Sequence, residues 1–411
     1  MQSPILSQIL SARFPVLLIL SLPSVPLTSG SIRVDCGSTT PIFDTATNSS
    51  WGIDQYYAGG TTYNITNAPA VGLSTTPEIA TLRAFPKGSD PCYHIPVPNG
   101  RFLVRLTWAY SNYDGLNAPP IFGVLFGPTQ ADYVDLNTVV NATDPVVFGD
   151  YLVYANTTLQ ICFYGEQGVP FINSIEVNPL DTDAYEASYW GTNVLLNLAV
   201  RLNGGGPAIT GYPTDPGYRP WSPDLPSAQV PYNPLSTTEA IASCGPTAAP
   251  DFLPCQMFQT AREASPAAKD VTIFTLNVAP VSDSNQWLLH LYFAEINATV
   301  KPGERTFYVI LAGYGNFTRI GEDTDTGFDA AQNGLFNATT IAIPFHFPPS
   351  YIQDLFVFGL VKTNGSLYNP ILNGFELYEV IADSLSNAST IEAGEGPNSP
   401  LLDSASEKVG R

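Results

Sequence analysis

One short segment of the chain combines aromatic and hydrogen-bonding side chains densely enough to suggest a ligand site. Tyr110, Tyr113, Asp114 and Asn117 all fall within eight residues. Proteins hold a saccharide by placing aromatic rings against its C–H face and carboxylate or amide groups against its hydroxyls. The segment is therefore a candidate sugar-binding loop. The alternative interpretation is a turn at Asp114-Gly115, with Tyr113 packed beneath it.

The remaining chemistry-bearing residues do not indicate catalysis or metal binding. There is no Gly-x-Ser-x-Gly nucleophile elbow, and the three histidines lie in strand-like or proline-flanked apolar segments. Glu176 and Glu376 occupy matching places in two similar segments, but both segments have the pattern of strands, which favours a structural role over a glycosidase pair. The acidic segment 322–329 lacks the closing glutamate of a calcium loop. We expect no enzyme activity, no metal and no cofactor.

Composition and charge limit the class of protein. The 411 residues include 37 Pro and 33 Gly, with 12% aromatic and 13% charged residues. This composition favours short β-strands joined by turns and excludes coiled coils, helical repeats and collagen. The net charge is −20, from 16 basic and 36 acidic residues. Because such a chain repels phosphate backbones, nucleic acid is excluded as a partner.

The N-terminus has the features of an export signal. Arg13 precedes an apolar run that starts at Phe14, and small residues follow at Thr28 and Gly30. We predict a signal peptide over residues 1–30. No later stretch approaches the roughly 20 apolar residues that a membrane-spanning helix requires. The sequence therefore predicts a protein of the secretory pathway, extracellular or in the cell wall, with no membrane span in this chain.

Glycosylation motifs and cysteines agree with export. Nine Asn-x-Ser/Thr motifs predict a glycoprotein, at Asn48, Asn64, Asn141, Asn156, Asn297, Asn316, Asn337, Asn364 and Asn387. Cys244 and Cys255 enclose a short Pro-rich loop and are predicted to form a disulfide. The pairing of Cys36, Cys92 and Cys162 stays open, since three cysteines leave one thiol over.

The elements that must position these residues occur twice. Three motifs recur in the same order, which indicates a tandem duplication of a whole domain. The first motif consists of Val34–Ser38 followed by Trp51–Asp54, and it recurs as Leu202–Gly206 followed by Trp221–Asp224. The second motif, Phe102–Tyr110, recurs as Trp287–Glu295, and the third, Pro170–Val177, recurs as Pro370–Leu377.

Each copy has the pattern of antiparallel β-sheet. Apolar side chains alternate along the first copy at Phe102, Val104, Leu106, Trp108 and Tyr110. A period of two, with Pro and Gly between the segments, favours a sandwich of two sheets. We therefore predict an all-β protein of two tandem, jelly-roll-like β-sandwich domains, over residues 31–190 and 191–381. A disordered polar tail is predicted over residues 382–411.

Several segments carry a family resemblance. Leu82–Gly88, Cys92–Val97, Asn112–Pro120 and Pro170–Glu176 resemble the malectin-like ectodomains of plant receptor-like kinases, most of all the type with leucine-rich repeats. Tyr212–Trp221 is similar to that family's link into the second domain. The resemblance covers roughly residues 32 to 381 and implies two malectin-like β-sandwich domains in tandem. It also implies either a secreted ectodomain alone or an incomplete gene model of a receptor kinase, which would lie at the plasma membrane.

The resemblance implies an extracellular recognition module whose ligand is a carbohydrate or a small basic secreted peptide. Animal malectin follows a Phe-Ala-Glu segment with an aromatic pair that grips a sugar. The second copy keeps Phe293–Glu295 but has Asn297 and Ala298 at the place of the pair, whereas the first copy keeps Tyr113. Trp51 and Tyr56 could add an aromatic wall to the first-domain site.

Charge separates the ligand classes. A polyanion such as de-esterified pectin would be repelled by this acidic chain, so a basic peptide or a neutral glycan is favoured. The alternative function is an interaction or decoy module that pairs with receptor ectodomains and binds no sugar.

Overall fold

A computed structural model describes most of the predicted domain region. It covers residues 30–45, 47–65, 77–137, 146–186, 194–224, 232–248, 250–265, 271–277, 286–313, 316–320, 327–346 and 355–382. The predicted signal peptide up to residue 29, the tail after 382, the predicted domain boundary at 190/191, and the motifs at Asn141 and Asn387 lie outside the described residues. None of the helices in the ranges given above is long and apolar enough to cross a membrane.

The N-terminal half is built from short strands, as its alternating pattern predicts. Its strands are β1 (Ile32–Asp35), β2 (Ile42–Asp44), β3 (Ser49–Trp51), β4 (Thr61–Asn64), β5 (Thr81–Ala84), β6 (Cys92–Pro96), β7 (Gly100–Ala109), β8 (Ile121–Phe126), β9 (Thr129–Asp135), β10 (Val146–Ala155), β11 (Thr158–Gln167), β12 (Phe171–Ile172) and β13 (Ser174–Pro179). Two short 3₁₀ turns are η1 (Pro77–Ile79) and η2 (Ala184–Glu186).

The C-terminal half has the same character, with a single short α-helix among its described residues, α2 (Cys255–Phe258). Its strands are β14 (Val194–Asn203), β15 (Ile209–Thr210), β16 (Pro220–Pro223), β17 (Tyr232–Ser236), β18 (Thr260–Ala264), β19 (Val271–Asn277), β20 (Gln286–Phe293), β21 (Thr306–Gly313), β22 (Asn316–Ile320), β23 (Phe328–Asp329), β24 (Thr339–His346), β25 (Leu355–Lys362), β26 (Ile371–Leu372) and β27 (Gly374–Ala382).

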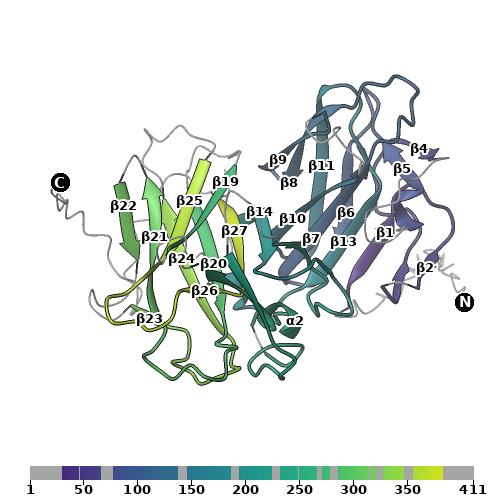
Figure 1. Ribbon diagram of the computed structural model, residues 1–411. Coiled ribbons are helices and arrows are strands. Elements are labelled where there is room, and N and C mark those ends of the chain that lie inside the picture. Colours follow the sequence, from purple (N-terminus) through teal and green to yellow (C-terminus); the bar gives the residue numbers. More distant parts are fainter. Residues whose placement is uncertain are drawn as a thin grey trace, which may run out of the picture.

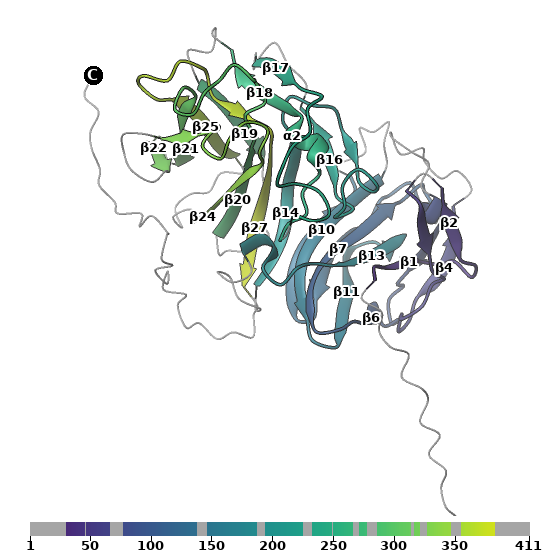
Figure 2. The same cartoon turned by 90° about the horizontal axis from the view of Figure 1, so that it is seen from below.

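These strands form two sandwiches that share one sheet, which confirms the predicted all-β fold of two tandem domains (Figure 1). The shared sheet has the order β1-β13-β7-β10-β14-β27-β20-β24. The sheet β6-β11-β8-β9 completes the first sandwich, and β19-β25-β21-β22 completes the second. Figure 2 shows β14 between β10 and β27, and β14 is antiparallel to both.

The faces of the shared sheet have different roles. Val104 and Leu106 of β7 point into the first core, and Leu289 and Leu377 play the same part in the second core. The opposite face, where the sequence places Arg101, Arg105 and Thr107, is also largely covered. A third apolar cluster lies on it and joins the two halves, at Leu103, Leu152, Leu196, Leu288 and Tyr378.

The two copies repeat individual hydrogen bonds. Asn173 Oδ1 accepts the Ala109 N–H at 2.7 Å, and Asn373 Oδ1 accepts the Ala294 N–H at 2.8 Å. In the first copy Asp54 accepts the Gly37 N–H; in the second, Asp224 accepts the Gly205 N–H. These bonds fix which residue of one copy corresponds to which residue of the other. The duplication inferred from the motifs therefore extends to the atomic level.

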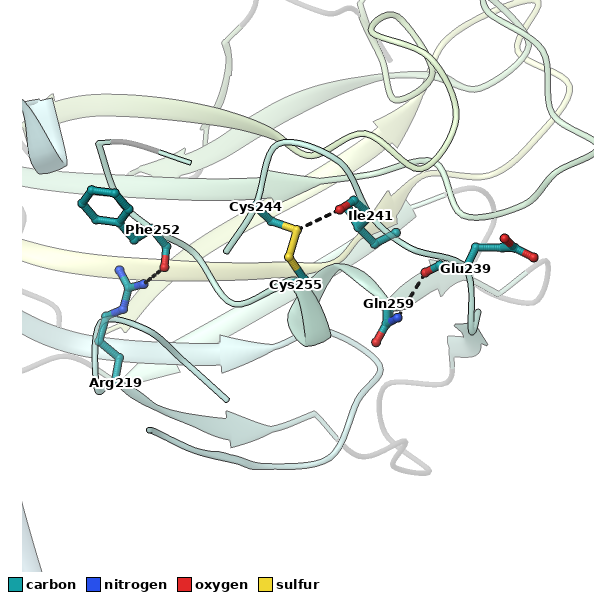
Figure 3. The surroundings of a disulfide bond; sticks show 7 residues. All are labelled: Arg219, Glu239, Ile241, Cys244, Phe252, Cys255 and Gln259. Atoms are coloured by element: carbon teal, nitrogen blue, oxygen red, sulfur yellow. Dashed lines mark hydrogen bonds between the residues drawn. A yellow bond between two sulfur atoms is a disulfide. The ribbon is translucent and has the colours of Figure 1, made fainter. Parts of the chain in front are cut away.

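Two disulfides lie in the described chain, one in each copy. Cys244–Cys255 is present as predicted, and Cys92–Cys162, whose pairing was left open, joins β6 to β11. Cys36 is a free, buried thiol. Figure 3 shows the second-domain disulfide, which fastens α2 to a loop; nearby, Arg219 donates to the Phe252 carbonyl at 3.0 Å.

Charged side chains of alternating sign cross the shared sheet and are nearly or fully buried. We call this set the charge row; its members in spatial order are Arg33, Glu176, Arg105, Asp150, Arg201 and Glu376. The link between the copies is Asp150, which lies 2.8 Å from Arg105 Nε and 2.5 Å from Arg201 Nη1. Burial by itself would raise the pKa of Asp150, but the two guanidinium groups outweigh burial and lower this pKa to about 2.

Replacing Asp150 by Ala tests the charge row. The substitution leaves Arg105 and Arg201 close together without their shared carboxylate, so we expect the free energy of unfolding to fall by about 3–5 kcal/mol. Denaturant unfolding measures this change. The control is Asp183→Ala, at an exposed position, which should alter stability by less than about 0.5 kcal/mol. Equal effects of the two substitutions would contradict a stabilising role for the row.

Candidate functional site

The predicted sugar-binding loop uses its polar groups internally. Tyr110 is buried, and its hydroxyl donates to Asp114 Oδ1 at 2.6 Å. The same carboxylate oxygen accepts the Leu116 N–H at 3.0 Å, and the Ala118 N–H donates to the Tyr110 hydroxyl. Asn117 is exposed. These bonds shape the loop without a ligand.

Tyr113 is partly buried and packs on the first core, which agrees with the structural interpretation. Its ring lies 4.9 Å from that of Tyr63 and 5.3 Å from that of Phe171, between centroids. Tyr56 also packs against this core, whereas Trp51 lines a cleft in which none of the loop residues takes part. The structure therefore does not bring Trp51 into a wall for the loop, and ligand binding by the loop stays a prediction.

The Phe-Ala-Glu segment of the second copy is also part of the core. Glu295 is fully buried, and Arg305 Nε donates to it at 2.6 Å. Glu295 also accepts the Asn297 N–H at 2.9 Å. In this copy, the segment holds the loop by an ion pair and a hydrogen bond.

A cleft of about 310 Å³ lies between the two halves, on the charge-row face of the shared sheet. The first half contributes side chains from β1, β2, β3, η1, β7, β10 and β13, and the second contributes β15, β16 and the turn between them. Arg33, Glu176 and Arg105 of the charge row line it. Sequence elements far apart in the chain therefore converge on one concave site.

Aromatic rings line this cleft. Tyr212 and Tyr218 stack with their centroids 4.5 Å apart and their planes 13° apart. The Arg33 guanidinium lies 4.3 Å from the Tyr218 ring centroid, and Arg105 donates to the Tyr218 carbonyl. Phe148, on the sheet side, is 46% exposed. Aromatic rings beside hydrogen-bonding groups were expected in the predicted sugar-binding loop. The structure has this combination at the domain junction.

Three buried side chains of the cleft each keep a polar atom without a hydrogen-bond partner. The atoms are Arg33 Nη2, Trp51 Nε1 and Glu78 Oε2. Burial is the main cause that raises the pKa of Glu78 to about 8. The neighbouring carboxylates of Glu176, Asp44 and Asp35 contribute to the same shift. Burial therefore favours the neutral carboxylic form of Glu78.

The cleft continues into a second hollow of about 290 Å³. Phe148, Pro220 and Ser222 line both hollows, and the second one reaches Asp150 and Arg201. The two together make a groove along the domain junction, which suits an extended ligand.

Sequence reasoning noted part of this site without placing it. Glu176 was recognised as a repeated residue, and Tyr212 and Tyr218 fall in the segment similar to a family link. Arg33, Glu78 and Phe148 were missed. The available signal was a charged residue within an otherwise apolar segment, Arg33 before Val34 and Glu78 before Ile79, which indicates a buried polar group that needs a partner.

The described glycosylation motifs differ in exposure. Asn48, Asn64, Asn156 and Asn364 are exposed, and Asn297 and Asn337 are half-buried. The side chain of Asn316 lies outside the described residues. Thr47 and Ser49, the neighbours of Asn48, line the cleft. Glycosylation at all these motifs remains a prediction.

Fold and comparisons together define the class of protein. Two sandwiches on a shared sheet form the architecture of a malectin-like receptor ectodomain. The ANX2 ectodomain from Arabidopsis thaliana has this fold, with a TM-score of 0.70 at 22% identity, over 86% of this chain and 97% of that one. For the plant receptor-like kinase FER the TM-score is 0.67 at 24% identity, over 85% and 96%.

Residues 34–380 match the family model of the malectin-like domain, so the chain belongs to the malectin-like domain family. Two relatives are Arabidopsis thaliana receptor-like kinases. The leucine-rich repeat receptor-like serine/threonine-protein kinase At2g14510 is 28% identical over 91% of this chain and 40% of its own length. The receptor-like protein kinase At3g21340 is 27% identical over 86% and 36%. The chain therefore spans about two fifths of the length of these relatives, and the predicted family resemblance is confirmed.

The raised pKa values near the cleft predict how stability depends on pH. Burial raises the pKa of Asp35 to about 7 and that of Glu78 to about 8, above their unfolded values. Their contribution to stability is complete below the unfolded pKa and is lost as pH rises through the folded pKa. Thermal unfolding should therefore show stability falling between about pH 5 and about pH 8. A slope that is unchanged in Glu78→Gln would contradict the assignment of this effect to Glu78.

Tyr113→Ala separates the two interpretations of the first-domain loop. Loss of the ring contacts with Tyr63 and Phe171 should lower stability by about 1–3 kcal/mol, measured by denaturant unfolding. If the loop also holds a ligand, the affinity of the folded fraction falls as well. Full affinity in folded Tyr113→Ala protein would remove the loop as a ligand site.

Proposed function

We propose that this protein is a non-catalytic extracellular recognition module that binds its ligand in the cleft between its two sandwiches. The observation that carries the proposal is the convergence of aromatic rings and unpartnered polar groups on that one cleft. Concave sites that combine apolar walls with a few polar groups are the usual form of a ligand site.

The proposed ligand is a carbohydrate or a small basic secreted peptide. The exposed ring of Phe148 in the cleft supports a carbohydrate, since aromatic faces cover sugar C–H groups. The net charge of −20 supports a basic peptide by long-range attraction. A solved complex contains the plant peptide RALF23 with FER and LLG2, and one of its chains has a TM-score of 0.64 to this protein at 23% identity. The peptide in that complex supports the peptide class.

A recognition role without catalysis also agrees with the charges in the cleft. Arg33 and Arg105 are paired with Glu176 and Asp150, so the ionised groups hold the sheet together. The two disulfides support a location in the secretory pathway, extracellular or in the cell wall. If the chain is part of a receptor kinase, as the length of its relatives allows, the module faces outward from the plasma membrane.

The second candidate function is an interaction module that pairs with receptor ectodomains and binds no sugar. The presence of a further protein, LLG2, in the FER complex supports it. A glycan array without hits, together with co-purification of a receptor ectodomain, would favour this function over ligand binding in the cleft.

A binding screen at low and high salt tests the proposal. We expect neutral oligosaccharides or basic peptides to bind more tightly than polygalacturonate, with salt weakening only the peptides. Tyr218→Ala should lower affinity several-fold, because a ring contact contributes about 0.5–1.5 kcal/mol beyond its buried area. Tyr133→Ala, at an exposed position in β9 outside the cleft, is the matched control. Preferential binding of polygalacturonate would overturn the ranking of ligands, and equal affinities of the two variants would remove the cleft as the site.

A further inference from the structure

The duplication supplies an internal comparison for the cleft. Each of the three side chains with an unpartnered polar atom has a counterpart in the second copy. Hydrogen bonds fix the correspondence: Asn173 donates to the Ile79 carbonyl, and Asn373 donates to the Phe258 carbonyl. Glu78 therefore corresponds to Met257, which directly precedes Phe258 in the chain.

Arg33 and Arg201 occupy the same place in their copies. Arg33 pairs with Glu176 in the strand register, and Arg201 pairs with Glu376. Arg201 Nη2 donates to the Tyr378 hydroxyl at 3.0 Å, whereas Arg33 Nη2 is buried and has no partner. The second copy therefore provides a hydrogen-bond partner for the Nη2 atom of its arginine, and the first copy does not.

The tryptophans show the same contrast. Trp221 Nε1 donates to Asp215 Oδ2 at 2.7 Å, whereas Trp51 Nε1 has no partner. Both indole rings are almost fully buried, so exposure to water does not explain the difference. The first copy has an unmatched donor at the edge of the cleft.

Glu78 and Met257 differ more sharply. Met257 is fully buried and apolar, as expected for a core position. Glu78 is 7% exposed and has an unpartnered Oε2 atom, although its duplicate shows that the fold accepts an apolar side chain there. A buried polar group without a partner is destabilising, and three of those in the described residues gather around this one cleft.

We propose that Arg33, Trp51 and Glu78 are the hydrogen-bonding set of the cleft and that they bind an uncharged, hydroxyl-rich ligand, a saccharide unit. This inference rests on the proposed function and narrows its ligand class.

The chemistry of the set decides against charged ligands. Two N–H donors, on Arg33 and Trp51, require acceptors. A chain of lysine and arginine offers these only through its backbone carbonyls, whereas every hydroxyl of a saccharide can accept. An anionic ligand would meet the carboxylates of Asp44 and Glu176 in the same cleft. A hydroxyl both donates and accepts, so it matches the two N–H groups as well as the Glu78 carboxyl. The raised pKa of Glu78 supports this match, because the neutral acid needs no counter-ion.

The test uses the protein with Ser50→Ala, which removes the predicted glycan beside the cleft. Its binding is measured to an array of neutral cell-wall oligosaccharides, to hexagalacturonate and to hexa-arginine. We expect neutral oligosaccharides to bind in preference to the two charged probes. Glu78→Met and Trp51→Phe should each lower that affinity about three- to tenfold, the loss of one hydrogen bond. Glu78→Met should keep or raise the Tm, because it installs the residue of the second copy.

Two controls keep the outcome interpretable. Trp221→Phe should lower the Tm, because it deprives Asp215 of a bonded N–H, and Tyr133→Ala should leave saccharide affinity unchanged. Absence of binding to every neutral oligosaccharide, or full saccharide affinity in both Glu78→Met and Trp51→Phe, overturns the inference. Binding of hexa-arginine that is lost in Tyr218→Ala would overturn it while leaving the proposed function of the cleft intact.

Discussion

The ion pairs around Asp150 are the interaction on which the rest of the structure depends. A carboxylate at this depth is tolerated only because two guanidinium groups, one from each copy, neutralise it. Arg105 belongs to the first sandwich and Arg201 to the second, so this one carboxylate bonds the two copies to each other. The charge row ends in the second copy because the next positions are not charged in the same way. His290 occupies the position equivalent to Arg105, and Ala342 occupies the position equivalent to Asp150.

The two copies differ at three equivalent positions in whether the side chain is satisfied within the protein. In the second copy the strand-end arginine, the buried tryptophan and the residue before Phe258 are all satisfied by the protein or apolar. In the first copy the equivalent positions hold polar side chains that line the cleft, and each has an atom without a hydrogen-bond partner. At these three positions the second copy favours stability, and the first copy carries the proposed ligand site at some cost in stability.

Much of the fold follows from sequence because it depends on local, periodic signals. The alternation from Phe102 to Tyr110 predicts a strand, and the recurrence of Pro170–Val177 predicts a second copy. The Cys244–Cys255 bond follows from proximity in the chain. The cleft could not be predicted in the same way, because Arg33, Phe148 and Tyr218 meet only through the pairing of β10 with β14. The loop at Tyr113 looked like a site because sequence shows residue types and not whether Asp114 is already hydrogen-bonded.

The position of β14, hydrogen-bonded on both edges, has a consequence for how occupancy is communicated. A hinged two-lobed protein closes on its ligand, and the closure itself is the signal. Here the two lobes are parts of one continuous sheet with a buried ionic seam, which opposes hinge motion between them. A ligand bound in the groove as proposed would therefore be detected through the surface that it leaves exposed, and not through domain closure. The exposed surface of the proposed ligand would then form part of the interface with a further protein, on a module that itself stays rigid.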